Sequence, residues 1–140
     1  MGSGNGLNHP LAHFKQLRLR QCYEYPLALP SVGFGSRTMV DLALQEKSYS
    51  RSPEMESNSF EYLKSHVAET SSVTFQIECG APLPPIKDPY LTARVIDQRD
   101  VAPGTLWIGQ LAGRRLSVTT SRFAEQIGRD LSDRYRHVGF

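Results

Sequence analysis

Hydrophobic and polar residues alternate over the first third of the chain. In residues 16–30, QLRLRQCYEYPLALP, leucine and tyrosine occupy odd positions, and arginine, cysteine and glutamate occupy even ones. A period of two residues is typical of a half-buried strand, so the pattern predicts a strand over residues 14–29. Residues 31–36, SVGFGS, read as a turn. Residues 37–45 alternate again and predict a second strand, antiparallel to the first.

Helical spacing appears in two later stretches. Ser52-Pro53-Glu54 has the residues of a helix start, a capping hydroxyl followed by proline and an acid. A short helix is therefore expected from there to Glu69. Ser121 is expected to cap a second, C-terminal helix, which is amphipathic. The apolar stripe of the first helix is Phe60, Leu63 and Val67, and that of the second is Phe123, Ile127, Leu131 and Tyr135.

The remaining segments alternate between strand and turn signals. Residues 72–79 and 90–97 predict strands on either side of a proline-rich loop, and 105–111 with 114–120 predict a hairpin. Together the segments predict the α+β class: a mainly antiparallel β-sheet with one short middle helix and a C-terminal amphipathic helix packed on it. Residues 1–13 are expected to form a flexible N-terminal lead, and residues 14–140 a single α+β domain.

Composition narrows the class of protein. The chain has 140 residues, 39% of them hydrophobic, which suffices for one core. It contains neither a signal-peptide pattern nor an apolar run of the roughly 18 residues that a transmembrane helix needs. Two cysteines outside any C-x-x-C pair favour a reducing, intracellular compartment. A net charge of +2 is too small to imply nucleic acid by itself.

Catalytic and cofactor motifs are weak. The four histidines are scattered, without metal-ligand spacing to a cysteine or carboxylate. Residues 33–37, GFGSR, begin like a phosphate-binding loop but lack the Gly-Lys-Ser/Thr ending, and no helix is expected to follow them. Cys79 and His66 could form a nucleophile pair, yet nothing in the sequence places them together. The sequence therefore predicts no catalytic residue, metal or cofactor.

Basic residues gather near both ends of the chain. On the final helix Arg122, Arg129 and Arg136 recur every seven residues along one face. One interpretation is a solvated face balanced by acids, and the other is a surface for RNA or lipid phosphate. The candidate phosphate-binding residues are Lys15, Arg18, Arg20, Arg114, Arg115, Arg122, Arg129 and Arg136.

A short peptide within the first predicted strand suggests a docking motif. Tyr25, Pro26 and Leu29 match the tyrosine-proline-spacer-leucine pattern with which enveloped viruses recruit host budding machinery. The alternative is the end of an edge strand, where proline is tolerated.

Two segments of the chain resemble the matrix proteins of negative-strand RNA viruses, the bornavirus matrix protein in particular. These are Ser72–Glu78, similar to a central strand, and Arg122–Gly139, similar to the closing helix. The resemblance implies a non-enzymatic, virion-associated protein that self-assembles as a homo-oligomer, in the cytoplasm or nucleus. It would bridge an anionic membrane surface and single-stranded RNA or nucleoprotein.

Two other readings of the chain stay open. The first is a capsid or other virion-assembly subunit. The second is a small ligand-binding or enzymatic α+β domain.

Overall fold

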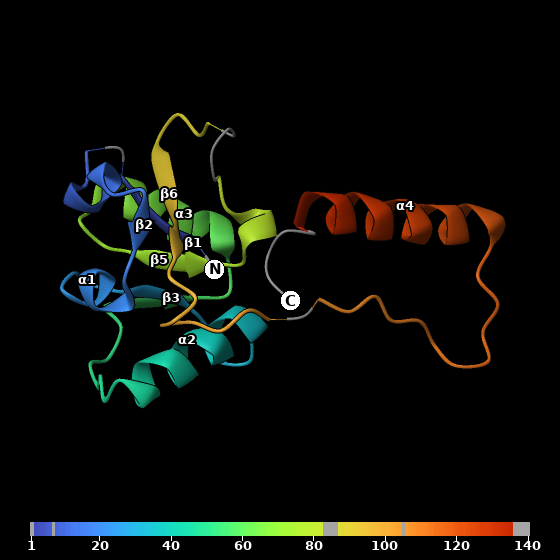
Figure 1. Cartoon of the computed structure of the whole chain (residues 1–140), viewed down its shortest axis with the longest axis horizontal. Helices are drawn as coiled ribbons and strands as arrows, with labels where there is room; N and C mark the ends of the chain where they lie inside the picture. The colour runs from blue at the N-terminus through green and yellow to red at the C-terminus, as the bar shows by residue number, and fades with distance from the viewer. Residues whose placement is uncertain (1, 7, 83–86, 105, 136–140) are drawn as a thin grey trace. The chain divides into compact units, whose positions relative to one another are not determined.

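The computed structural model describes residues 2–6, 8–82, 87–104 and 106–135. The chain divides into two compact units (Figure 1), unit 1 over Met1–Ala102 and unit 2 over Pro103–Phe140.

Unit 1 contains a four-stranded sheet in the order β2-β6-β1-β5. Its strands are β1 (Gly2–Gly6), β2 (Gln16–Leu17), β5 (Thr74–Gln76) and β6 (Leu91–Ile96). β1 pairs antiparallel with both β5 and β6, whereas β2 pairs parallel with β6. The sheet is therefore mixed in direction.

A second sheet of two strands lies next to the first. β3 (Ala28–Pro30) and β4 (Met55–Ser57) pair in parallel, and all three residues of β3 are buried. An isolated parallel bridge joins Leu27, just before β3, to Val73, just before β5. Continuous burial is typical of a strand covered on both faces.

The described residues of unit 1 also form three α-helices and two short 3-10 turns. The helices are α1 (Leu19–Tyr23), α2 (Gly35–Glu46) and α3 (Phe60–Glu69). The turns are η1 (Pro10–His13) and η2 (Glu78–Gly80). Both α2 and α3 contact β3, and α3 also contacts β4, so the helices pack on the two strands that carry the site described below.

Two clusters of apolar side chains form the core of unit 1. The larger cluster contains the fully buried Phe75 and Leu17 and receives Val40, Ala43 and Leu44 from α2. The smaller cluster packs Leu63 and Val67 of α3 against Ala28 of β3. β3 thus supplies side chains to both clusters, through Leu29 and Ala28.

The described part of unit 2 is a segment without regular secondary structure followed by one helix. α4 spans Val118–Tyr135, and Ser117 caps it by accepting a hydrogen bond from the Thr120 amide at 3.2 Å. The C-terminal helix predicted from the sequence is therefore confirmed, with its cap four residues earlier than Ser121. The described residues 106–117 contain no strand, so the predicted hairpin is wrong.

The predicted first strand is replaced by several short elements. Residues 14–29 contain β2, helix α1 and the start of β3. Helix α1 forms because Leu19 and Cys22, three positions apart, are both buried on one side, and because Gln21 accepts a hydrogen bond from the Arg18 amide. The alternation of leucines and polar residues predicts a single strand. The prediction is wrong here because a short helix also gives Leu19 and Cys22 a common buried side.

The predicted second strand is the helix α2. Leu42 is 56% exposed, whereas Val40, Ala43 and Leu44 are buried, which is helical spacing and not alternation. The middle helix is confirmed, but it begins after Ser59 instead of Ser52, because residues 55–57 pair with β3 as β4.

The fold combines helices and strands, as the predicted α+β class requires, but the mainly antiparallel detail of that prediction is not supported. Strands predicted at 72–79 and 90–97 correspond to β5 and β6. Gly2–Gly6 form β1, within the expected flexible lead. The domain boundary at residue 14, and the packing of the C-terminal helix on the sheet, stay predictions.

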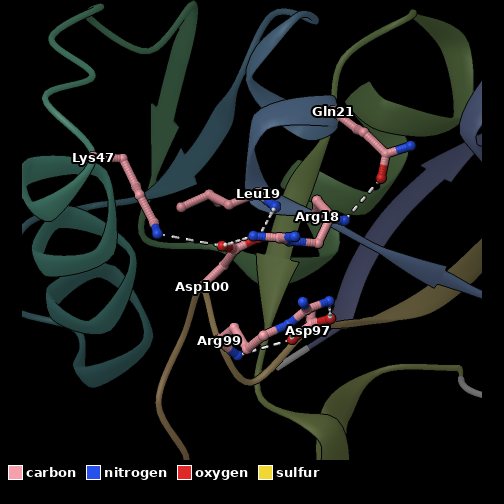
Figure 2. Close-up of polar contacts among 7 residues, drawn as sticks. All are labelled: Arg18, Leu19, Gln21, Lys47, Asp97, Arg99 and Asp100. Carbon is pink, nitrogen blue, oxygen red and sulfur yellow. Dashed lines mark hydrogen bonds and ion pairs between the residues drawn. The ribbon is translucent and has the colours of Figure 1, made fainter.

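One carboxylate joins three separate segments of unit 1 (Figure 2). Asp100 accepts two hydrogen bonds from the guanidinium of Arg18, at 2.7 and 2.9 Å, and a third from the Leu19 amide at 2.9 Å. Lys47, at the end of α2, lies 3.5 Å from the same carboxylate. The side chain of Asp100 is only 3% exposed, so its charge is compensated inside the protein.

Removing this charge is expected to destabilise unit 1. Asp100→Asn keeps the shape but loses the ion pairs with Arg18 and Lys47, so the free energy of unfolding should fall by about 2–3 kcal/mol. Urea denaturation followed by circular dichroism measures the change. Asp130→Asn, on the exposed surface of α4, is the matched control and should change stability by less than about 0.5 kcal/mol. Equal effects of the two variants would contradict this role of Asp100.

The same carboxylate makes stability depend on pH in the acid range. Hydrogen bonds from Arg18 hold the pKa of Asp100 well below its usual value. The Leu19 amide and the charges of Arg18 and Lys47 lower it further, whereas burial acts to raise it. Arg99 lowers the pKa of the neighbouring Asp97 to about 2. The unfolded chain binds protons at these carboxyls near pH 3.9, before the folded chain does, so unfolding is favoured as pH falls below about 4.

Urea titrations between pH 5 and pH 2 check this dependence. The wild-type stability should decline over that range, and the Asp100→Asn variant should decline less steeply. Parallel pH profiles for the two proteins would show that Asp100 does not contribute.

Candidate functional site

The carboxyl ends of β3 and β4 lie side by side. The parallel register pairs Ala28 with Met55 and Pro30 with Ser57, and the Ser31 amide donates to the Ser57 carbonyl at 2.9 Å. Both strands therefore end at the same edge of the sheet, and each continues into a helix. In open α/β sheets, ligands bind at this edge.

The first of these helices, α2, begins without a capping side chain. Its N-cap residue is Phe34, which makes no side-chain hydrogen bond to the helix, and the first turn contains no acidic residue. The amide groups of the first turn carry the positive end of the helix dipole. Gly33, just before the helix, has a φ of +104°, a conformation that glycine adopts without strain.

The second helix, α3, begins next to the first. Ser59 caps it by accepting a hydrogen bond from the Tyr62 amide at 3.3 Å. Phe60, its first residue, packs edge-to-face on Phe34 with ring centroids 5.6 Å apart. The N-termini of α2 and α3 thus meet at the edge where β3 and β4 end. We call this group of residues, Ser31–Ser36 together with Ser57–Phe60, the strand-end site.

Arg37 ties α2 to both strands behind the strand-end site. Its guanidinium donates to the Pro30 carbonyl at 2.9 Å and to Asp41, and it lies 3.2 Å from Glu56 of β4. Burial lowers the pKa of Arg37, but the hydrogen bonds to Glu56 and Asp41 outweigh that effect and leave the pKa raised. Arg37 therefore stays charged and serves to position the helix.

Two open cavities lie elsewhere on unit 1. One, of about 490 Å³, lies along α2 and the segment Tyr49–Pro53, and the other, of about 430 Å³, lies between residues 8–10 and 68–71. Arg37 and Glu56 are paired with each other in the first, and His9 in the second already bonds the Ser71 carbonyl and the Leu11 amide. The strand-end site has the stronger case because two helix N-termini lie at this edge, and the amides of a helix's first turn point beyond its N-terminus.

The basic residues predicted to bind phosphate belong to different units. Arg18 is engaged by Asp100, while Lys15 and Arg20 are exposed in unit 1. Arg114, Arg115, Arg122 and Arg129 are exposed in unit 2, and Arg129 lies 3.9 Å from Glu125. Arg136 lies outside the described residues. The role of these residues in phosphate binding stays a prediction.

The predicted docking peptide lies within the fold. Leu29 is buried in β3, and Tyr25 and Pro26 are half-buried. The Pro26 carbonyl accepts a hydrogen bond from the Val73 amide at 2.9 Å, so this peptide is not a free edge.

Residues of other potential sites are also placed by the structure. Ser72 donates to Glu54 at 2.6 Å and lies 3.4 Å from His66, and the bond from Ser72 lowers the pKa of Glu54. Among the described residues, no three His, Cys, Asp or Glu side chains are placed to hold a metal ion. No helix within the described ranges is both long enough and apolar enough to cross a bilayer.

A comparison with protein families matches most of the chain. The LysR substrate-binding domain model aligns with residues 7–132. The chain belongs to the LysR substrate-binding domain family. A search of curated proteins gives no match.

Solved structures agree with this assignment. The regulatory domain of Synechocystis CcmR, solved in complex with 2-PG, has a TM-score of 0.64 at 21% identity, over 89% of this chain and 59% of that one. The effector-binding domain of QuiR, in complex with shikimate, has a TM-score of 0.62 at 16% identity, over 89% of this chain and 57% of that one. The LysR-family regulator HinK from Pseudomonas aeruginosa has a TM-score of 0.62 at 17% identity, over 89% of this chain and 42% of that one. This chain therefore spans between 42% and 59% of the length of these neighbours.

The LysR assignment overturns the resemblance to viral matrix proteins. The family match over residues 7–132 leaves no support for matrix-type self-assembly or a place in the virion. It also leaves none for the predicted partners, which were single-stranded RNA or nucleoprotein, an anionic membrane surface and host budding machinery. Of the two segments that carry the resemblance, Ser72–Glu78 contains β5, and the described part of Arg122–Gly139 lies in α4; both are elements of a LysR-type fold. The match supports the alternative of a small ligand-binding domain.

The strand-end site was missed because residues 31–37 were read as a turn followed by a strand. The signal was present: two glycines, Gly33 and Gly35, precede apolar residues at helical spacing, Val40, Ala43 and Leu44. The sequence argues against a phosphate loop at GFGSR because the Gly-Lys-Ser/Thr ending and a following helix are both missing; the ending is absent, but helix α2 does begin within this stretch, at Gly35.

The conformation of this loop can be tested with two glycines two residues apart. Gly33→Ala places a side chain at a φ of +104° and should lower the free energy of unfolding by about 1–2 kcal/mol. Gly35→Ala, at the start of α2 with no atom within 4 Å of the new Cβ, is the control and should raise it by about 0.4–1 kcal/mol. Thermal unfolding of the two variants measures both effects. If the signs are the same, the described loop conformation is wrong.

Proposed function

We propose that this chain senses a small-molecule effector for a LysR-type transcriptional regulator, and that an anionic effector binds at the strand-end site. The observation that carries the proposal is the meeting of two helix N-termini, those of α2 and α3, at the edge where two parallel strands end. The described geometry offers binding groups and no nucleophile with its base at this edge, so the proposed role is recognition without chemistry.

The chemistry of the site favours an anion that also has hydroxyl groups. The first turn of α2 lacks both an acid and a side-chain cap, so its amides can donate to a carboxylate or phosphate. The segments that lead into the two helices also contain the short polar residues Ser31 and Asn58, and the contact of Phe34 with Phe60 adds an apolar wall. Shikimate, named for the QuiR structure, is a hydroxylated carboxylate, and it serves with 2-PG as a probe.

The LysR-type solved neighbours also support a role within a larger regulator. Two of them are described as a regulatory domain and as an effector-binding domain, and HinK as a transcriptional regulator. Because the chain spans 42–59% of these neighbours, the DNA-binding and regulatory activity of a whole regulator is part of the proposal.

A charge placed at the start of α2 tests the proposal. Gly35→Asp introduces a carboxylate in open space at the helix N-terminus, where it stabilises the helix but repels an anion. Calorimetric titration of the chain with shikimate and with 2-PG should show binding of at least one probe. The Gly35→Asp variant should lose about tenfold in affinity, equivalent to about 1.4 kcal/mol.

Gly35→Asn is the matched control, because it has the same shape without the charge, and its affinity should stay within about threefold of the wild-type value. The proposal is contradicted if neither probe binds, or if the Asp and Asn variants bind the probes equally well. Circular dichroism establishes that both variants are folded.

A further inference from the structure

One buried hydroxyl group at the strand-end site has no hydrogen-bond partner. Ser36, the second residue of α2, is only 8% exposed. Thr38, two residues along, donates its hydroxyl to the Phe34 carbonyl at 3.3 Å, but within the described part of the chain the Ser36 hydroxyl makes no hydrogen bond. Burying an unpaired hydroxyl costs free energy, and such groups are rare in folded proteins. Ser36 therefore calls for a partner that the chain itself does not supply.

The geometry of α2 directs this hydroxyl toward the strand-end site. Ser36 lies on the same helix face as Val40 and Ala43, which pack in the larger apolar cluster of unit 1. It is the first position of that face, at the beginning of the helix. Since every Cα–Cβ bond in a helix tilts toward the N-terminus, the Ser36 side chain leans toward the edge where β3 and β4 end.

The main-chain amides around Ser36 are also unpaired. The first main-chain hydrogen bond of α2 runs from the Thr38 amide to the Phe34 carbonyl at 3.1 Å. The three amides before it, those of Gly35, Ser36 and Arg37, have no acceptor among the residues that the structure describes. Three amides and one hydroxyl thus lie together as donors at the positive end of the helix dipole.

The carbonyl acceptors at the same edge already have donors. The Pro30 carbonyl accepts from the Arg37 guanidinium at 2.9 Å, and the Ser57 carbonyl accepts from the Ser31 amide at 2.9 Å. The Ser31 carbonyl in turn accepts from the Phe34 amide at 3.4 Å. The unpaired groups of the site are therefore donors. An ionised carboxylate or phosphate matches them, because its charged oxygens only accept.

We propose that Ser36 determines specificity at the strand-end site: its hydroxyl donates a hydrogen bond to the oxyanion group of the effector, a carboxylate or a phosphate, beside the amides of the first turn of α2. The inference rests on the proposed function and deepens it, because it names a side chain that recognises the charged group. A hydroxyl that is paired only in the complex stabilises the complex and destabilises the free protein. Removing it should therefore weaken binding without weakening the fold.

The main test is Ser36→Ala, with Thr38→Val as the matched control. In calorimetric titrations with shikimate and with 2-PG, Ser36→Ala should bind about tenfold more weakly than the wild-type chain. Thr38→Val removes an exposed hydroxyl that is already bonded to the helix, and its affinity should stay within about threefold of the wild-type value. Ser36→Cys keeps a side chain of similar shape, but its thiol is a weak donor, so it should lose affinity as Ser36→Ala does.

Thermal unfolding without a probe gives a second readout, which does not depend on any ligand. The Tm of Ser36→Ala should equal or exceed that of the wild-type chain, because the variant no longer buries an unpaired hydroxyl. A fall of more than about 3 °C would show that the hydroxyl already has a partner within the protein, and the proposal would be overturned.

The outcomes separate this inference from the proposed function. If Gly35→Asp weakens binding but Ser36→Ala stays within about threefold of the wild-type affinity, the anion binds without Ser36 and this inference alone is overturned. It is also overturned if Ser36→Ala and Thr38→Val lose affinity equally. If neither probe binds the wild-type chain, the proposed function and this inference are both overturned.

Discussion

The parallel alignment of β3 with β4 is the constraint on which the proposed ligand site depends. Parallel strands place their carboxyl ends at one edge, and here each strand continues directly into a helix. The N-termini of α2 and α3 consequently meet, with Phe34 and Phe60 in contact. An antiparallel arrangement would have sent one of these helix starts to the opposite edge, away from the other. The proposed binding groups are mostly main-chain amides, so the proposed site follows from the fold itself.

Two charged interactions hold this arrangement in place. Arg37 connects α2 to the end of β3 through the Pro30 carbonyl and to β4 through Glu56. Asp100 connects the end of α2, through Lys47, to the start of α1 and to the turn that follows β6. Both side chains are largely buried and their charges are compensated by close partners. Because their ionisation states are fixed near neutral pH, they serve as structural connections at the two ends of α2.

The sequence predicted some elements well, for reasons that particular residues show. α4 and β6 were found because their apolar residues follow one period over a long stretch, Phe123 to Tyr135 and Leu91 to Ile96. α1 and α2 were misread as strands because short amphipathic helices with leucines at even spacing, such as Leu42 and Leu44, also fit alternation. In this stretch only the burial of Ala43, next to the exposed Leu42, distinguishes the helical period of 3.6 residues from the strand period of two.

The candidate site was harder to predict, since it depends on contacts between distant residues. Nothing local in the sequence pairs Pro30 with Ser57, or brings Phe34 to Phe60. Arg18 looked like a free phosphate-binding residue because its partner, Asp100, is far away in the sequence. The viral resemblance rested on two segments, whereas the family match extends over residues 7–132.

The central claim, that an anionic effector binds where α2 and α3 begin, is tested most directly by amide chemical-shift mapping. A ¹H–¹⁵N correlation spectrum of the labelled chain would be recorded during titration with shikimate and with 2-PG. The account predicts that the largest saturable shifts fall on the amides of Gly35 and Ser36, with smaller ones at Ser59 and Phe60. Shifts confined to the cavity along Tyr49–Pro53, or no saturable shifts with either probe, would contradict it.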